Sequence, residues 1–145
     1  MQIRGLIPTA TATEIWLDKI HAFPHRAYLK YRDVYDLWWL RHYELAEVDC
    51  TQLAPRFDYH RELYNSTQPK DLAAKIRARA AQMTSEGLRH ELFAHLPVAL
   101  FGAYTDKKCA EIVDFVRTDL EHFIEHYERH HGLRAWPADD LVISP

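Results

Sequence analysis

The strongest pattern in the sequence is an apolar stripe at helical spacing across residues 105–130. Hydrophobic side chains recur there every three or four residues, as on one face of an α-helix. Thr105 is of a type that caps helix starts, and Gly132 is of a type that ends helices. The stripe therefore predicts one long amphipathic helix, whose apolar face consists of Ile112, Phe115, Val116, Leu120, Phe123 and Tyr127.

Shorter helices are predicted before this one. Thr11 and Glu14 have the spacing of a capping box, and Pro24 should end or bend the helix that they open. A second, aromatic-rich helix is predicted from about Arg26 to Glu47, and a loop is expected after it at residues 50–55. The remaining predicted helices cover residues 57–64, 70–83 and 85–96.

Strand signals are scarce, because only residues 98–104 and 141–143 resemble strands and both runs are short. A chain of 145 residues that is 48% hydrophobic is the size and composition of one globular domain. The sequence therefore predicts a single all-α domain over residues 1–145. We expect a bundle of five to six helices with one short extended segment at residues 1–12.

Charge and cysteine content narrow the possible partners. The net charge is −3, so bulk positive charge does not favour a nucleic-acid partner, although a local patch stays open. No apolar run reaches the roughly 18 residues of a membrane span. Cys50 and Cys109 do not form a disulfide framework. These features predict a cytoplasmic protein without a membrane partner.

Charged residues among the aromatics of the second helix are the first candidates for chemistry. Asp33 and Asp36 are three residues apart and therefore share one helical face. Such a pair can hold a divalent cation or orient a base, and with Lys19 nearby it could serve a triphosphate and its Mg²⁺. The simpler interpretation is an ion pair of Arg32 with Asp36 that braces two packed helices.

Two stretches, residues 12–22 and 30–40, resemble the AbiEii/AbiGii-type nucleotidyltransferase toxins. The C-terminal region of that family carries a helix with a Glu-Lys-like pair, followed after a short spacer by an Arg-Asp-x-Tyr-Asp-Leu motif. Lys19 matches the lysine of the first motif, while Asp18 stands where many members have Glu. The resemblance covers residues 3–45, and the second motif is matched by Arg32, Asp33, Tyr35, Asp36 and Leu37.

The resemblance implies a nucleotide site in which Lys19 and Arg32 bind a nucleoside triphosphate with Mg²⁺. It assigns catalytic roles to Lys19, Asp33 and Asp36, in a component of a toxin–antitoxin or abortive-infection system. The family's N-terminal catalytic core supplies a Gly-Ser loop and a carboxylate pair for two metals. The sequence has no Gly-Ser dipeptide and no Asp-x-Asp, so we expect that core to be absent and the chain to be inactive alone. A partner carrying the core, or a homodimer, is then expected.

The nearest substitutes for the carboxylate pair are Glu47 with Asp49 and Asp119 with Glu121. Residues two apart on a helix point to different sides, so neither pair is expected to hold a metal.

Histidine-containing patterns leave other functions open. His122, His126 and His130 lie at four-residue spacing, which suits zinc or nickel with Glu121 or Glu125, but a solvated helix end is the simpler interpretation and no metal site is predicted. Two Arg–His spacings resemble the motif of HEPN-type ribonucleases, which are also all-α. A dimeric interaction module that uses the aromatic helix is a further alternative. The Arg–His pairs are Arg117 with His122 and Arg89 with His95.

Overall fold

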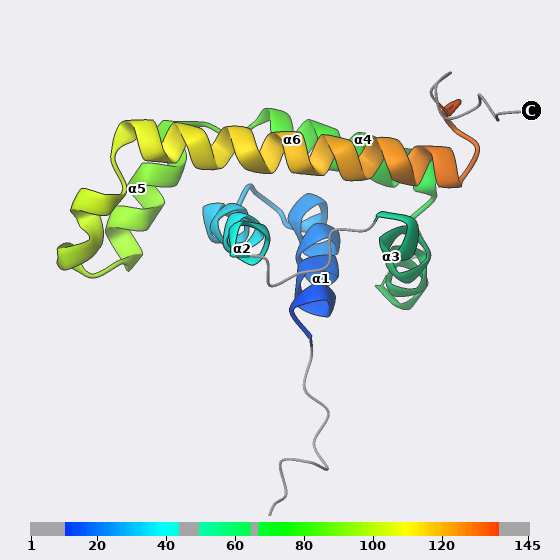
Figure 1. Ribbon diagram of the computed structural model, residues 1–145, viewed down its shortest axis with the longest axis horizontal. Coiled ribbons are helices and arrows are strands. Elements are labelled where there is room, and N and C mark those ends of the chain that lie inside the picture. Colours follow the sequence, from blue (N-terminus) through cyan, green and yellow to red (C-terminus); the bar gives the residue numbers. More distant parts are fainter. Residues whose placement is uncertain (1–10, 44–49, 65–66, 137–145) are drawn as a thin grey trace, which may run out of the picture.

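Helix α6 (Asp106–His130) is the central helix of the fold, and helices α2 to α5 all pack against it (Figure 1). The computed structural model describes residues 11–43, 50–64 and 67–136. In the orientation of Figure 1, α4 runs alongside α6, while α1, α2 and α3 lie below it and run across its direction. The latter three therefore cross α6 at a steep angle. The other elements are α1 (Ala12–His25), α2 (Tyr31–His42), α3 (Cys50–Tyr64), α4 (Pro69–Ala81), α5 (Ser85–His95) and the 3₁₀ helix η2 (Val98–Ala103).

The predicted all-α class is confirmed, since the described residues contain six α-helices, one 3₁₀ helix and no strand. The caps expected from the sequence also form. The hydroxyl of Thr11 accepts from the Glu14 backbone N–H at 3.1 Å, and that of Thr105 accepts from Lys108 at 3.1 Å. Gly132 has a φ of +70°, the left-handed conformation that ends a helix and that glycine adopts without strain.

Two predicted boundaries are wrong. The second helix begins at Tyr31 rather than Arg26, because Arg26 is the extended C-cap of α1 and residues 26–30 form the connection. Residues 50–55 belong to α3 although they include Pro55, and burial of Leu53 there favours the helix. Of the two strand candidates, residues 98–104 contain the 3₁₀ helix η2.

Three further predictions fall wholly or partly outside the described residues. These are the end of the second helix at residues 44–47, the strand candidate at residues 141–143, and the extended N-terminal segment, of which only residues 11–12 are described.

Aromatic side chains join α1 and α3 to α6. The Phe123 ring meets that of Trp16 edge-on at 5.2 Å between centroids and that of Phe57 at 5.1 Å, and all three side chains are fully buried. The guanidinium of Arg41 lies 4.4 Å above the Trp16 ring and binds Asp119 of α6 at 2.8 Å. The core is therefore anchored on the predicted apolar face of α6, except for Phe115, which is 39% exposed. No helix within the described ranges is long and apolar enough to cross a bilayer.

Arg77 of α4 clamps two carboxylates that lie two turns apart on α6. Its guanidinium binds Glu121 at 2.9 Å and Glu128 at 2.7 Å. The hydrogen bonds from Arg77 hold the pKa of Glu128 below its ordinary value, outweighing the opposing effect of burial. The clamp therefore fixes α4 along α6.

The lowered pKa of Glu128 predicts a pH-dependent contribution to stability. A carboxyl with a lowered folded-state pKa stabilises the fold above its unfolded pKa, and the contribution is lost as the pH falls through the folded value. Glu128→Gln should cost about 1 kcal/mol at neutral pH and nothing at about pH 2. Urea unfolding at both pH values measures this. Glu111→Gln, on the exposed side of α6, is the control, and an equal loss at both pH values would contradict the prediction.

Candidate functional site

Lys19, Asp33 and Asp36 meet between α1 and α2. The Lys19 amino group lies 3.2 Å from Oδ1 of Asp33 and 2.9 Å from Oδ2 of Asp36. The Asp33 side chain is fully buried, whereas those of Lys19 and Asp36 are 23% and 33% exposed. The structure thus brings together the three residues to which the resemblance assigned catalytic roles.

The local sequence explains this arrangement. Lys19 lies in the middle of α1, and Asp33 lies in the first turn of α2. A carboxylate in the first turn is stabilised by the positive end of the helix dipole. Asp36 follows one turn later on the same face. The crossing of α1 over α2 then places the Lys19 amino group between the two carboxylates.

Arg26 completes the cluster, and sequence reasoning missed it. Its Nε binds Oδ2 of Asp33, and its Nη2 donates to Oδ1 at 3.0 Å, which makes a bidentate pair. The hydrogen bond to Asp33 raises the pKa of Arg26 against the opposing effect of burial. Had residue 26 been helical, Arg26 would lie about 10 Å along the helix from Asp33.

The connection after α1 folds Arg26 back onto Asp33, and α4 holds it in place. Arg79 of α4 donates to the carbonyl of Arg26 and, at 3.5 Å, to that of Pro24. The only signal for this arrangement in the sequence was Pro24. It lies one residue before the end of α1, so Arg26 is the first residue outside the helix.

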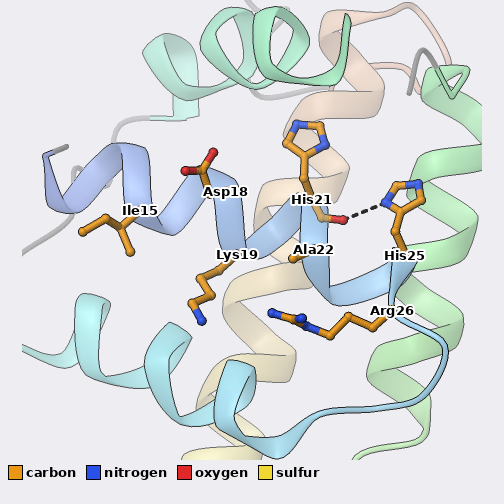
Figure 2. A pocket seen from close by; sticks show the side chains of 7 residues that line it. All are labelled: Ile15, Asp18, Lys19, His21, Ala22, His25 and Arg26. Carbon is orange, nitrogen blue, oxygen red and sulfur yellow. Dashed lines mark hydrogen bonds between the residues drawn. The ribbon is translucent and has the colours of Figure 1, made fainter. Parts of the chain in front are cut away.

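Lys19 and Arg26 line an open pocket of about 470 Å³ on α1, here named the Lys19 pocket. Figure 2 shows both side chains extending from α1 toward α2, with their charged ends close to one another. His21 is buried and stacks on Phe57, while the ring of His25 is held by a 2.7 Å hydrogen bond from Nδ1 to the His21 carbonyl. The complete lining is Ile15, Asp18, Lys19, His21, Ala22, His25 and Arg26.

Arg32 lies outside this cluster. It is exposed and forms no ion pair with any residue that the structure describes, so the alternative Arg32–Asp36 brace is not formed. Arg32 and Asp36 both line a second pocket of about 670 Å³ between α2 and α5. Asp36 therefore has Lys19 on one side and the pocket of Arg32 on the other.

Tyr35, also part of the matched motif, lines this second pocket. Its hydroxyl lies 2.8 Å from that of Tyr104. Burial, followed by the hydrogen bond to Tyr104, raises the pKa of Tyr35 above its ordinary value. Tyr35 therefore stays neutral at physiological pH and can act as a hydrogen-bond donor.

The histidine row of α6 does not assemble as a unit. His122 is exposed, His126 packs edge-on against Trp136, and His130 turns toward Asp58 of α3. Among the side chains that the structure describes, the one group of three potential metal ligands is Asp58, His130 and His131. Asp58 is distant in sequence, so no local pattern indicates it.

The two Arg–His pairs differ in their surroundings. Arg117 and His122 line one shallow pocket, although Arg117 also donates to the Met83 carbonyl at 3.0 Å. Arg89 binds Asp106 at 2.6 Å, whereas His95 binds Glu91 at 3.0 Å. Arg89 and His95 thus have separate partners.

The substitute carboxylate pairs are likewise divided. Asp119 binds Arg41 at 2.8 Å, and Glu121 binds Arg77 at 2.9 Å. Two arginines on different helices therefore hold these carboxylates apart. Glu47 and Asp49 lie outside the described residues.

The difference in burial between Asp33 and Asp36 predicts a difference in stability. Asp33→Asn should destabilise the protein by about 3 kcal/mol, because it leaves two cations beside a buried neutral group. Asp36→Asn removes a partly exposed ion pair and should cost less than about 1 kcal/mol. Urea unfolding of both variants measures these values. Equal losses would show that Asp33 is not the anchor of the cluster.

Comparison with known proteins places the chain in a family. The family model described as nucleotidyl transferase AbiEii toxin, type IV TA system, matches residues 4–138. Searches of the curated proteins and of the solved structures gave no match. The match extends far beyond residues 3–45 and includes every helix described above. The chain therefore belongs to the AbiEii nucleotidyl transferase toxin family of type IV toxin–antitoxin systems.

Proposed function

We propose that the Lys19 pocket binds the triphosphate of a nucleoside triphosphate that is carried with Mg²⁺. Membership of a nucleotidyltransferase family implies a nucleotide substrate. The observation that carries the proposal is the pair of cations, Lys19 and Arg26, held side by side in the wall of an open pocket. An ammonium and a guanidinium are the groups that bind phosphate oxygens best.

The buried carboxylate of Asp33 prepares these cations for binding. It accepts hydrogen bonds from Lys19 at 3.2 Å and from Arg26 at 3.0 Å, so both side chains are already ordered. Ordering a long side chain otherwise costs binding free energy, about 0.5–1.5 kcal/mol for each. Because Asp33 is fully buried, it acts through Lys19 and Arg26 and does not touch the substrate.

The cations suit the reaction of the family. In nucleotidyl transfer an acceptor oxygen bonds to the α-phosphorus, the bond to the bridging oxygen breaks, and pyrophosphate leaves with its negative charge. Lys19 and Arg26 would stabilise that leaving charge. Arg32, in the neighbouring pocket beyond Asp36, would contact another part of the nucleotide.

The metal-binding carboxylates of the reaction would come from a separate catalytic core. Two-metal transfer needs carboxylates that are free to bind Mg²⁺. Asp33 already accepts from two cations, and Asp36 binds Lys19, so these aspartates suit the fixing of cations rather than of metal. The helical domain would then close over a nucleotide held by a partner that carries the core. An antitoxin is a further expected partner.

Thermal unfolding with nucleotide tests the proposal. ATP, GTP, CTP and UTP are added separately with Mg²⁺ at millimolar concentration, and at least one should raise Tm, since a ligand that binds the folded state stabilises it. Lys19→Gln should weaken that nucleotide's binding about tenfold or more. Comparing the shift on addition of nucleotide, rather than Tm itself, separates binding from the stability of each variant.

Lys75→Gln is the matched control, because Lys75 lies exposed on α4 outside the pocket. It should bind nucleotide as the unchanged protein does. The proposal fails if none of the four nucleotides shifts Tm, or if Lys19→Gln and Lys75→Gln bind equally well. Lys19 would then serve only to brace α1 against α2.

A further inference from the structure

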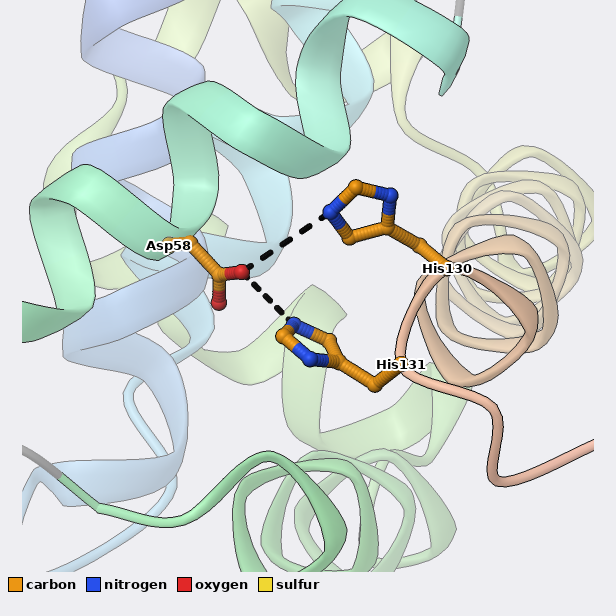
Figure 3. A group of neighbouring side chains, drawn as sticks. All are labelled: Asp58, His130 and His131. Atoms are coloured by element: carbon orange, nitrogen blue, oxygen red, sulfur yellow. Dashed lines mark ion pairs between the residues drawn. The ribbon is translucent and has the colours of Figure 1, made fainter.

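We propose a zinc site formed by Asp58 of α3 together with His130 and His131 at the C-terminal end of α6. Figure 3 shows the two imidazole rings turned toward the same carboxylate oxygen of Asp58. Nε2 of His131 lies 2.6 Å from Oδ2 of Asp58, and Nε2 of His130 lies 3.9 Å from it. The three ligand atoms all lie within 4.8 Å of one another.

These separations fit one bound ion. Zinc binds imidazole nitrogen and carboxylate oxygen at about 2.0–2.1 Å in a tetrahedral arrangement, which puts two ligand atoms about 3.3–3.4 Å apart. The observed 2.6 Å and 3.9 Å lie on either side of that value. Side-chain rotations that widen the first separation and narrow the second would bring Oδ2 to the distance from both nitrogens that zinc requires.

The surroundings of Asp58 leave one of its oxygens for the metal. Oδ1 accepts a hydrogen bond from the Tyr127 hydroxyl at 2.5 Å and another from Nε of Arg61 at 3.2 Å. Oδ2 faces the two histidines. Partners of this kind orient a ligand carboxylate in metal sites.

His131 and Asp58 are in direct contact without a metal. Nε2 of His131 is buried and lies 2.6 Å from Oδ2 of Asp58. A metal would bind both atoms, with the lone pair of Nε2 given to the ion. The rings and the carboxylate remain 20–39% exposed, so the site is open to solvent.

The donor set favours zinc over magnesium. Two imidazoles and one carboxylate suit zinc and its neighbours nickel and copper, whereas Mg²⁺ prefers six oxygen ligands. Three protein ligands leave the fourth tetrahedral position for water. The ion would join α3 to the end of α6. No residue of this site lines the Lys19 pocket, so the inference stands apart from the proposed nucleotide binding.

Calorimetric titration of the chelator-treated full chain with Zn²⁺ tests the site. We expect one strong site per chain, a rise in Tm on adding Zn²⁺, and no binding of Mg²⁺ alone at this site. His130→Gln and His131→Gln should each weaken zinc binding about tenfold or more, because each removes one of three ligands. Co²⁺ in place of zinc should give the visible absorption of a four-coordinate ion, and both variants should lose it.

His122→Gln is the matched control, since His122 lies exposed on the same helix two turns away. It should bind zinc like the unchanged protein. The inference is overturned if no stoichiometric site is found, or if His122→Gln weakens binding as much as His130→Gln does. Circular dichroism without metal checks that each variant is folded. If His131→Gln is not, the more exposed His130→Gln decides the result.

Discussion

The buried carboxylate of Asp33 is the interaction on which the α1–α2 half of the structure depends. A charge without solvent is tolerated only when it is paired and hydrogen-bonded, and its partners here are Lys19 and Arg26. One partner lies on α1 and the other on the connection after it. Satisfying Asp33 therefore fixes both the crossing of the two helices and the path of the chain between them. Buried Asp33 therefore accounts both for the stability of the α1–α2 half and for the positions of Lys19 and Arg26.

The rest of the fold depends on the apolar face of α6. Phe123 contacts Trp16 of α1 and Phe57 of α3, so one residue of that face joins two helices that cross it. Apolar packing alone does not fix the orientation of a helix, and charged residues beside the face do so. Arg77 fixes α4 along α6 because it binds Glu121 and Glu128. Both candidate sites are built on helices that α6 holds in this way.

Periodicity in the sequence was sufficient to predict the helices that bury only one face. The long stripe predicted a helix through about His130, where α6 ends. The shared face of Asp33 and Asp36 was also predicted from spacing, whereas the family resemblance joined Lys19 to them, and Lys19 lies 2.9 Å from Asp36. Patterns within one helix carry this information because side chains three or four residues apart share a face. The all-α class follows from the same signal.

Contacts between distant segments could not be predicted in this way. Arg26 joins the cluster only because the chain leaves the helix after His25 and α4 holds the connection through Arg79. Asp58 meets His130 only through the packing of α3 on α6, and the beginning of α3 was itself predicted to be a loop. In each case tertiary contacts outweighed the local preference of the residues involved.

The charges around Lys19 determine what the proposed binding of a phosphate would require of the cluster. Two cations and two carboxylates cancel, so the cluster as a whole has no surplus charge to attract a phosphate. The two carboxylates are not equivalent, however, because the pair with Asp36 is partly exposed and worth only about 0–1 kcal/mol, whereas Asp33 is fully buried. In the proposed nucleotide binding, Lys19 would therefore exchange Asp36 for a phosphate oxygen while it keeps Asp33.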